Sequence, residues 1–95
     1  MPSIDQTYAQ IAEFARMHGV RKVTLFGSRA RGDNLAKSDI DLAVEGCPDF
    51  DAFEHDVQER LWSLLSIDVV NLDAGVSQSL LDDIRRDGRV LYEKV

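Results

Sequence analysis

The chain has 95 residues, of which 44% are hydrophobic and 29% charged, with one cysteine and a formal net charge of −6. That length predicts one domain over residues 1–95, and the acidic balance argues against direct nucleic acid binding, because phosphate contacts need a basic surface. No segment approaches the ~18 apolar residues needed to cross a bilayer and the N-terminus lacks a signal pattern, so we expect no membrane association and a cytoplasmic location.

The first half of the chain is expected to form one long helix, two strands and a short helix between them. Ser3–Gln6 resembles a capping box, and apolar residues at helical spacing continue from there until Gly19 ends the run. A β-branched and aromatic strand is predicted at 22–26, a short helix at 28–32 and a second strand at 39–45.

The second half continues this alternation. Apolar residues over 50–65 trace a helix that should cover the sheet, and Trp62, off the centre of its stripe, is either part of the core rim or a partner surface. A buried strand is predicted at 67–72, a helix at 76–87 and a short strand or extended segment at 89–92. The whole pattern predicts an α/β fold, with helices packed on a small mixed sheet.

Two carboxylates one residue apart, Asp39 and Asp41, stand at the start of the second predicted strand. Alternate residues of a strand share a face, so both side chains project the same way, about 6.6 Å apart along the backbone. At a separation near 5 Å and an effective dielectric of about 20, their repulsion is on the order of 3 kcal/mol. A divalent cation between them would make the arrangement favourable. The alternative is a solvated edge strand, where acidic residues discourage edge pairing.

Three further residues favour a binding site here. Asp68 opens the next apolar strand and could place its carboxylate beside the first two. Gly27 and Ser28 form a strand-to-helix corner, where glycine permits close backbone approach and the free N–H groups of the helix start can hold an anion. Such a pair, seen alone, is better explained by ordinary turn and capping chemistry. The combination with the acids is what favours a phosphate site.

At this point the chain resembles a known family. Gly27-Ser28, ten intervening residues, Asp39-x-Asp41 and the later Asp68 resemble the motif of the nucleotidyltransferase superfamily that includes DNA polymerase β. The likeness is greatest to the minimal nucleotidyltransferases of prokaryotes, small proteins encoded beside a helical HEPN partner, and it covers roughly residues 20–95. It implies a single-domain nucleotidyltransferase fold and an enzyme that uses ATP as substrate and Mg²⁺ as cofactor.

The resemblance also implies a role for each motif residue. Asp39, Asp41 and Asp68 would be the catalytic acids that hold one or two Mg²⁺ ions, and Asp68 would also orient the attacking hydroxyl. Gly27 and Ser28 would hold the nucleoside triphosphate. Hard oxygen ligands suit Mg²⁺, which can stabilise the negative charge that grows on the entering and leaving oxygens during transfer.

Two arginines follow the Gly-Ser corner. Arg29 and Arg31 are candidate phosphate ligands, because guanidinium groups match phosphate oxygens. Either could instead be a solvated helix residue that pairs with Asp33.

The resemblance leads to one principal hypothesis and two alternatives. The principal one is an antitoxin that transfers AMP from ATP to a hydroxyl, on a tyrosine of a cognate HEPN RNase toxin, within a hetero-oligomer. Little of the chain is left to build an acceptor pocket, which suggests that a separate protein presents the acceptor. The first alternative is a non-catalytic antitoxin or binding subunit that occludes a helical partner. The second is transfer to a small molecule or RNA, for which the chain has neither an acceptor domain nor a basic track.

Overall fold

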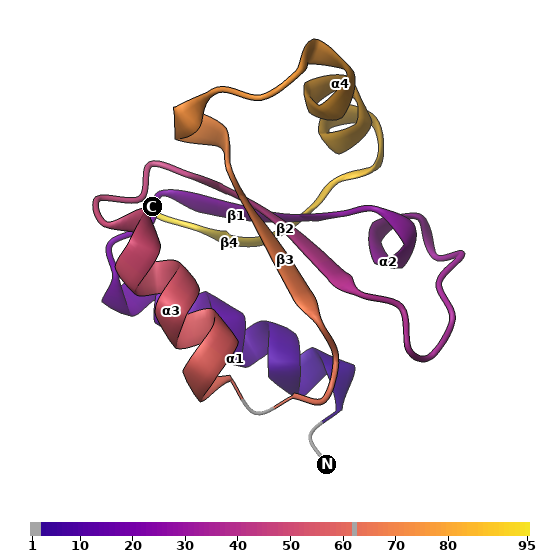
Figure 1. Ribbon diagram of the computed structural model, residues 1–95, viewed down its shortest axis with the longest axis horizontal. Helices are drawn as coiled ribbons and strands as arrows, with labels where there is room; N and C mark the ends of the chain where they lie inside the picture. The colour runs from indigo at the N-terminus through magenta and orange to yellow at the C-terminus, as the bar shows by residue number, and fades with distance from the viewer. Residues whose placement is uncertain (1–2, 62) are drawn as a thin grey trace.

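Helices α1 and α3 cover one face of a four-stranded sheet, and α4 lies over the other (Figure 1). The computed structural model describes residues 3–61 and 63–95. Along the chain its elements are α1 (Ile4–Met17), β1 (Lys22–Phe26), α2 (Ser28–Arg31), β2 (Ile40–Glu45), α3 (Phe50–Arg60), β3 (Ile67–Asn71), a 3₁₀ turn (Leu72–Ala74), α4 (Gln78–Asp87) and β4 (Arg89–Glu93).

The sheet is mixed, with strand order β3-β2-β1-β4. Strand β1 runs antiparallel to β2 and β4, whereas β2 and β3 are parallel, joined by the crossover helix α3. This confirms the predicted α/β class with helices packed on a small mixed sheet. Among the residues that the structure describes, no helix is long and apolar enough to span a bilayer.

Side-chain caps fix where the three longer helices begin. The Ser3 hydroxyl accepts the N–H of Gln6, and the Gln6 side chain accepts the N–H of Ser3, which confirms the predicted capping box. Asp49 caps α3 and Ser77 caps α4 through their side-chain oxygens. Each such cap contributes about 1 kcal/mol to helix stability.

The core lies between the sheet and helices α1 and α3. Leu25 of β1 faces Leu42 of β2 across the antiparallel pair, and both are fully buried against Ile11 of α1 and Phe53 of α3. Alternate residues of a strand point to opposite faces of the sheet. Asp41, the residue before Leu42 in β2, therefore lies on the face opposite to the core. One strand therefore fills the core and also presents an acid on the face that α4 partly covers.

One helix is shorter than its apolar pattern predicts. The spacing indicates a helix through residue 65, but α3 ends at Arg60 and Leu61 has an extended backbone, with φ −74° and ψ 128°. Leu64 is 81% exposed, so it does not belong to the buried stripe. The chain must turn here for β3 to pair with β2, and the Gln58 side chain holds that turn by donating to the carbonyl of Ile67 at 2.7 Å. The prediction for Trp62 lies outside the described residues.

The predicted third strand is present but is not buried on both faces. Strand β3 is an edge strand in which Asp68 is exposed and the following residues are half-buried. It also ends at Asn71, one residue earlier than predicted, and a 3₁₀ turn follows. An apolar edge strand and an apolar central strand have the same sequence pattern. The pattern at 67–72 therefore could not show that β3 lies at the edge of the sheet.

Candidate functional site

The motif residues meet at one end of the sheet. Because β1 is antiparallel to β2, and β2 is parallel to β3, the end of β1 lies beside the starts of β2 and β3. Gly27 and Ser28 directly follow β1, Asp39 directly precedes β2, and Asp41 and Asp68 are the second residues of their strands. The topology thus gathers segments that are far apart in the sequence.

Asp41 and Asp68 are direct neighbours across the parallel β2–β3 pair. Adjacent strands lie about 4.8 Å apart, so both carboxylates rise from the same small area of the sheet. Asp41 is half-buried, whereas Asp68 and Asp39 are exposed. This face is the one opposite to α1 and α3, because Asp41 alternates with the core residues Ile40 and Leu42. The acids therefore line a face that a ligand can reach.

Gly27 packs directly against the Asp41 carboxylate. Its backbone has φ 75° and ψ −157°, a conformation that is almost restricted to glycine. A Cβ added here would stand 2.3 Å from Asp41 Oδ2 and 3.2 Å from its Cγ. Only the absence of a side chain lets the Gly-Ser corner approach the acid this closely. The sequence indicated close backbone approach at this glycine, but not that Asp41 would be the neighbour.

The electrostatic environment of Asp41 is unfavourable for its negative charge. Burial raises the pKa of the Asp41 carboxyl, and the negative charges of Asp68 and then Asp39 raise this pKa further. A hydrogen bond with Asp68 acts in the same direction, while Arg31 lowers the pKa in part. These effects identify Asp41 as the point where the three acids act on one another, so a cation bound there would relieve their repulsion.

The donor set suits a hard divalent cation. Carboxylate oxygens are the ligands that Mg²⁺ prefers, and neighbouring strands supply two of them at matched positions. As the side chains stand, no group of three or more acidic, histidine or cysteine residues within 3–61 and 63–95 is close enough to hold a metal ion. Asp41 and Asp68 already interact through a hydrogen bond, and the charge of Asp39 also acts on Asp41. The residues fit such an ion in their chemistry and in the matched strand positions of Asp41 and Asp68.

Helix α2 places its two arginines in different environments. The Arg29 side chain donates from Nε to the Ser38 carbonyl at 2.9 Å and from Nη2 to the Ala36 carbonyl at 3.0 Å. Arg29 therefore holds the loop that leads into Asp39, a contact that the sequence did not reveal. Arg31 pairs with Asp33 at 3.1 Å, as the solvated alternative predicts. Its charge nevertheless lowers the pKa of Asp41 in part.

Comparison with known proteins gives a consistent result. The family model described as "Polymerase beta, Nucleotidyltransferase" matches residues 9–95. A candidate protein adenylyltransferase of Methanocaldococcus jannaschii is 37% identical over an alignment of 82 residues, and the match covers 77% of this chain and 79% of that protein.

Solved structures with the same fold come from toxin–antitoxin complexes. A crystal structure of a toxin–antitoxin with AMP-PNP matches 92% of this chain and 73% of its own chain, with a TM-score of 0.71 and 25% identity. A tri-AMPylated Shewanella oneidensis HEPN toxin in complex with an MNT antitoxin matches 95% of this chain and 73% of its own, with a TM-score of 0.65. Its 23% identity shows a shared fold.

Proposed function

Because the chain belongs to the polymerase beta nucleotidyltransferase family, we propose that it is a Mg²⁺-dependent protein adenylyltransferase that moves AMP from ATP to a hydroxyl of a partner protein. The observation that carries this proposal is the Asp41–Asp68 neighbour pair with Gly27 packed against it. A paired, partly buried set of carboxylates is costly for a small domain unless it has a ligand. The 37% identical relative named as a candidate protein adenylyltransferase supports the same chemistry.

Each motif residue has a distinct part in this proposal. Asp39, Asp41 and Asp68 hold the Mg²⁺, which when bound offsets the charge that develops on the phosphoryl oxygens. The backbone at Gly27 and the hydroxyl of Ser28 hold the triphosphate beside these acids. The acceptor oxygen attacks the α-phosphorus as the bond to pyrophosphate breaks, and the proton of the hydroxyl passes to the Asp68 carboxylate, which releases it to water. The exposure of the Asp68 carboxylate supports this role, because an exposed carboxylate can accept a hydrogen bond from an incoming hydroxyl.

The phosphate role is assigned to Arg31 rather than to Arg29. Arg31 is exposed, its charge already acts on Asp41, and its pairing with Asp33 is a surface contact that is worth little. Arg29 is committed to two loop carbonyls and acts by positioning Asp39.

The partner in this proposal is a helical HEPN toxin, and its acceptor is a tyrosine hydroxyl. The support is the fold shared with chains of toxin–antitoxin complexes, one of which holds an AMPylated HEPN toxin with an MNT antitoxin. Adenylylation would silence the toxin, so the chain would act as an antitoxin within a hetero-oligomer.

The test is to mix the protein with the product of its neighbouring gene, ATP and Mg²⁺, and to measure the intact mass of that neighbour. We expect the mass of one or more AMP groups to be added, and to be absent with Asp39→Asn, Asp41→Asn or added EDTA. Undiminished transfer by the Asp→Asn variants would remove the assigned roles. Rescue of toxin-expressing cells by the triple Asp→Asn variant would instead favour simple occlusion of the partner.

A further inference from the structure

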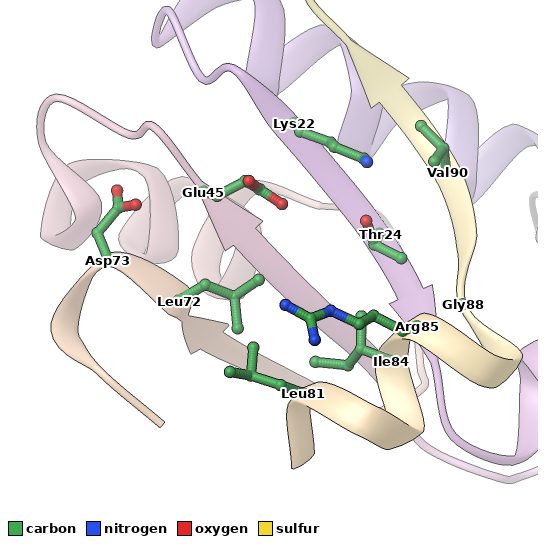
Figure 2. A pocket seen from close by; sticks show the side chains of 10 residues that line it. All are labelled: Lys22, Thr24, Glu45, Leu72, Asp73, Leu81, Ile84, Arg85, Gly88 and Val90. Atoms are coloured by element: carbon green, nitrogen blue, oxygen red, sulfur yellow. The ribbon is translucent and has the colours of Figure 1, made fainter. Parts of the chain in front are cut away.

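A pocket of about 590 Å³ lies between α4 and the sheet, on the same face as Asp41 (Figure 2). Its floor includes Thr24 of β1, and its apolar walls come from Leu72, Leu81, Ile84 and Val90. Helix α4 contacts the sheet closely at Ile84, which is 9% exposed, while Val90 remains 51% exposed beside the opening. Helix α4 therefore forms one side of the pocket and leaves its interior open.

The pocket lies further along the same strands as Asp41, on the same face of the sheet. In the β1–β2 pair, Thr24 lies opposite Ala43, which is two residues after Asp41. Lys22 lies opposite Glu45, which is four residues after Asp41. Each step of two strand residues covers about 6.6 Å, so the pocket extends from roughly 7 to 13 Å from Asp41. A molecule whose reacting atom lies at the acids can therefore also occupy this pocket.

The pocket is lined by two acids and two cations, which differ in their partners. Its two acids already have partners, since Glu45 accepts from Arg21 at 2.8 Å and Asp73 accepts from the backbone N–H of Gly46 at 2.9 Å. Its two cations, Lys22 and Arg85, make no ion pair or side-chain hydrogen bond with any residue in 3–61 or 63–95. Figure 2 shows the Arg85 side chain extending from α4 over the apolar walls of the pocket. In a chain of net charge −6, two unpaired cations in one pocket indicate an anionic occupant.

We propose that this pocket binds an acidic side chain of the acceptor protein, about four residues from the hydroxyl that receives AMP. This inference rests on the proposed function, because it is the transfer site that brings an acceptor segment to this face. An extended peptide covers about 13 Å in four residues, which matches the distance from Asp41 to Lys22. The apolar walls then cover the stem of the acidic residue while Lys22 and Arg85 pair with its carboxylate.

Other occupants match the pocket less well. A nucleoside carries no negative charge, so it would leave both cations unpaired. An RNA strand needs a succession of basic groups, whereas here two cations share a wall with Glu45 and Asp73. A peptide with one acidic residue uses both the two cations and the apolar surface.

The experiment is an NMR titration of the full chain with Ac-Tyr-Ala-Leu-Ala-Glu-NH₂ and its reversed sequence, each compared with a version in which Gln replaces Glu. We expect saturable shifts at Thr24, Leu81 and Val90, with binding about threefold to thirtyfold weaker for the Gln versions, as two partly exposed ion pairs would give. The double variant Lys22→Glu/Arg85→Glu should lose these shifts. The matched control Lys37→Glu/Lys94→Glu makes the same change in net charge outside the pocket and should retain them.

Separate outcomes decide the two proposals. The variant Lys22→Gln/Arg85→Gln replaces the double reversal if the latter unfolds. Less than a twofold difference between Glu and Gln peptides, or pocket shifts that follow ATP or a single-stranded oligonucleotide instead, would overturn the acidic-residue assignment. A parallel titration with ATP and Mg²⁺ reports on Gly27, Asp41 and Asp68. Shifts there without peptide binding would leave the proposed function standing and remove only the pocket.

Discussion

Replacing Gly27 by alanine tests whether the packing of the Gly-Ser corner on Asp41 matters for both stability and activity. The new Cβ would lie 2.3 Å from Asp41 Oδ2, well inside van der Waals contact, so the carboxylate must move. The backbone at φ 75° and ψ −157° also becomes strained, which costs about 1–3 kcal/mol, and turning the Asp41 side chain off its rotamer adds about 1 kcal/mol.

Gly32→Ala is the matched control. Gly32 also has a positive φ, 86°, but nothing lies within 4 Å of an added Cβ, so only about 1–2 kcal/mol of backbone strain is expected. The Gly27 variant should therefore be less stable than the Gly32 variant by about 1–2 kcal/mol, or roughly 4–16 °C in melting temperature.

Two assays measure this difference. Thermal or urea unfolding gives the stabilities, and the mass assay with ATP and the partner gives the transfer activity. We expect Gly32→Ala to retain transfer and Gly27→Ala to lose it at temperatures where both are folded. Equal stability and equal activity of the two variants would refute the argument that Gly27 is required by its contact with Asp41.

Three further variants separate structure from chemistry. Asp41→Asn should abolish transfer without lowering the melting temperature, because it removes a charge that Asp68 and Asp39 repel; a large loss of stability in thermal unfolding would contradict this. Arg29→Ala should lower the free energy of unfolding by about 1–2 kcal/mol and reduce transfer severalfold, because the carbonyls of Ala36 and Ser38 lose their donor. Urea unfolding and the mass assay measure the two effects. Unchanged values would argue against a role of Arg29 in holding this loop. The hydrogen bond with His18 lowers the pKa of the Asp56 carboxyl. The ionised Asp56 therefore stabilises the fold at pH values above its unfolded-state pKa of about 3.9, and this stabilisation is lost as the pH falls through the lower folded-state pKa. Urea unfolding from pH 7 to pH 3 should therefore show Asp56→Asn to be less stable than the unmodified chain at neutral pH, with the gap closing in acid; a constant gap would show that this pairing does not act.

The early part of the fold follows from local signals. The capping box at Ser3, the β-branched strand before Gly27 and the alternation around Asp41 each involve residues close in sequence, and the structure has these elements where the pattern predicts them. The end of α3 was missed because Leu64 has the correct helical spacing but is exposed. The helix ends because β3 must pair with β2, and this pairing between residues far apart in sequence is not visible in the apolar spacing of the helix.

The candidate site divides in the same way. Residue identity and spacing were enough to single out Asp39 and Asp41, although β2 begins at Ile40, so Asp39 lies just before the strand and strand alternation does not fix its direction. The contact between Gly27 and Asp41 and the clamp from Arg29 to the Ser38 carbonyl depend on the antiparallel register and on loop geometry. No short motif specifies these. The pocket under α4 needs the tertiary arrangement as well, since Lys22 and Arg85 are far apart in sequence.

The most direct test of the central claim is a crystal structure of the protein with Mn²⁺ and a non-hydrolysable ATP analogue, with the metal located by its anomalous signal. We expect an anomalous peak coordinated by oxygens of Asp41 and of Asp39 or Asp68, with the triphosphate against Gly27 and Ser28. A peak elsewhere, or a nucleotide bound away from this end of the sheet, would contradict it.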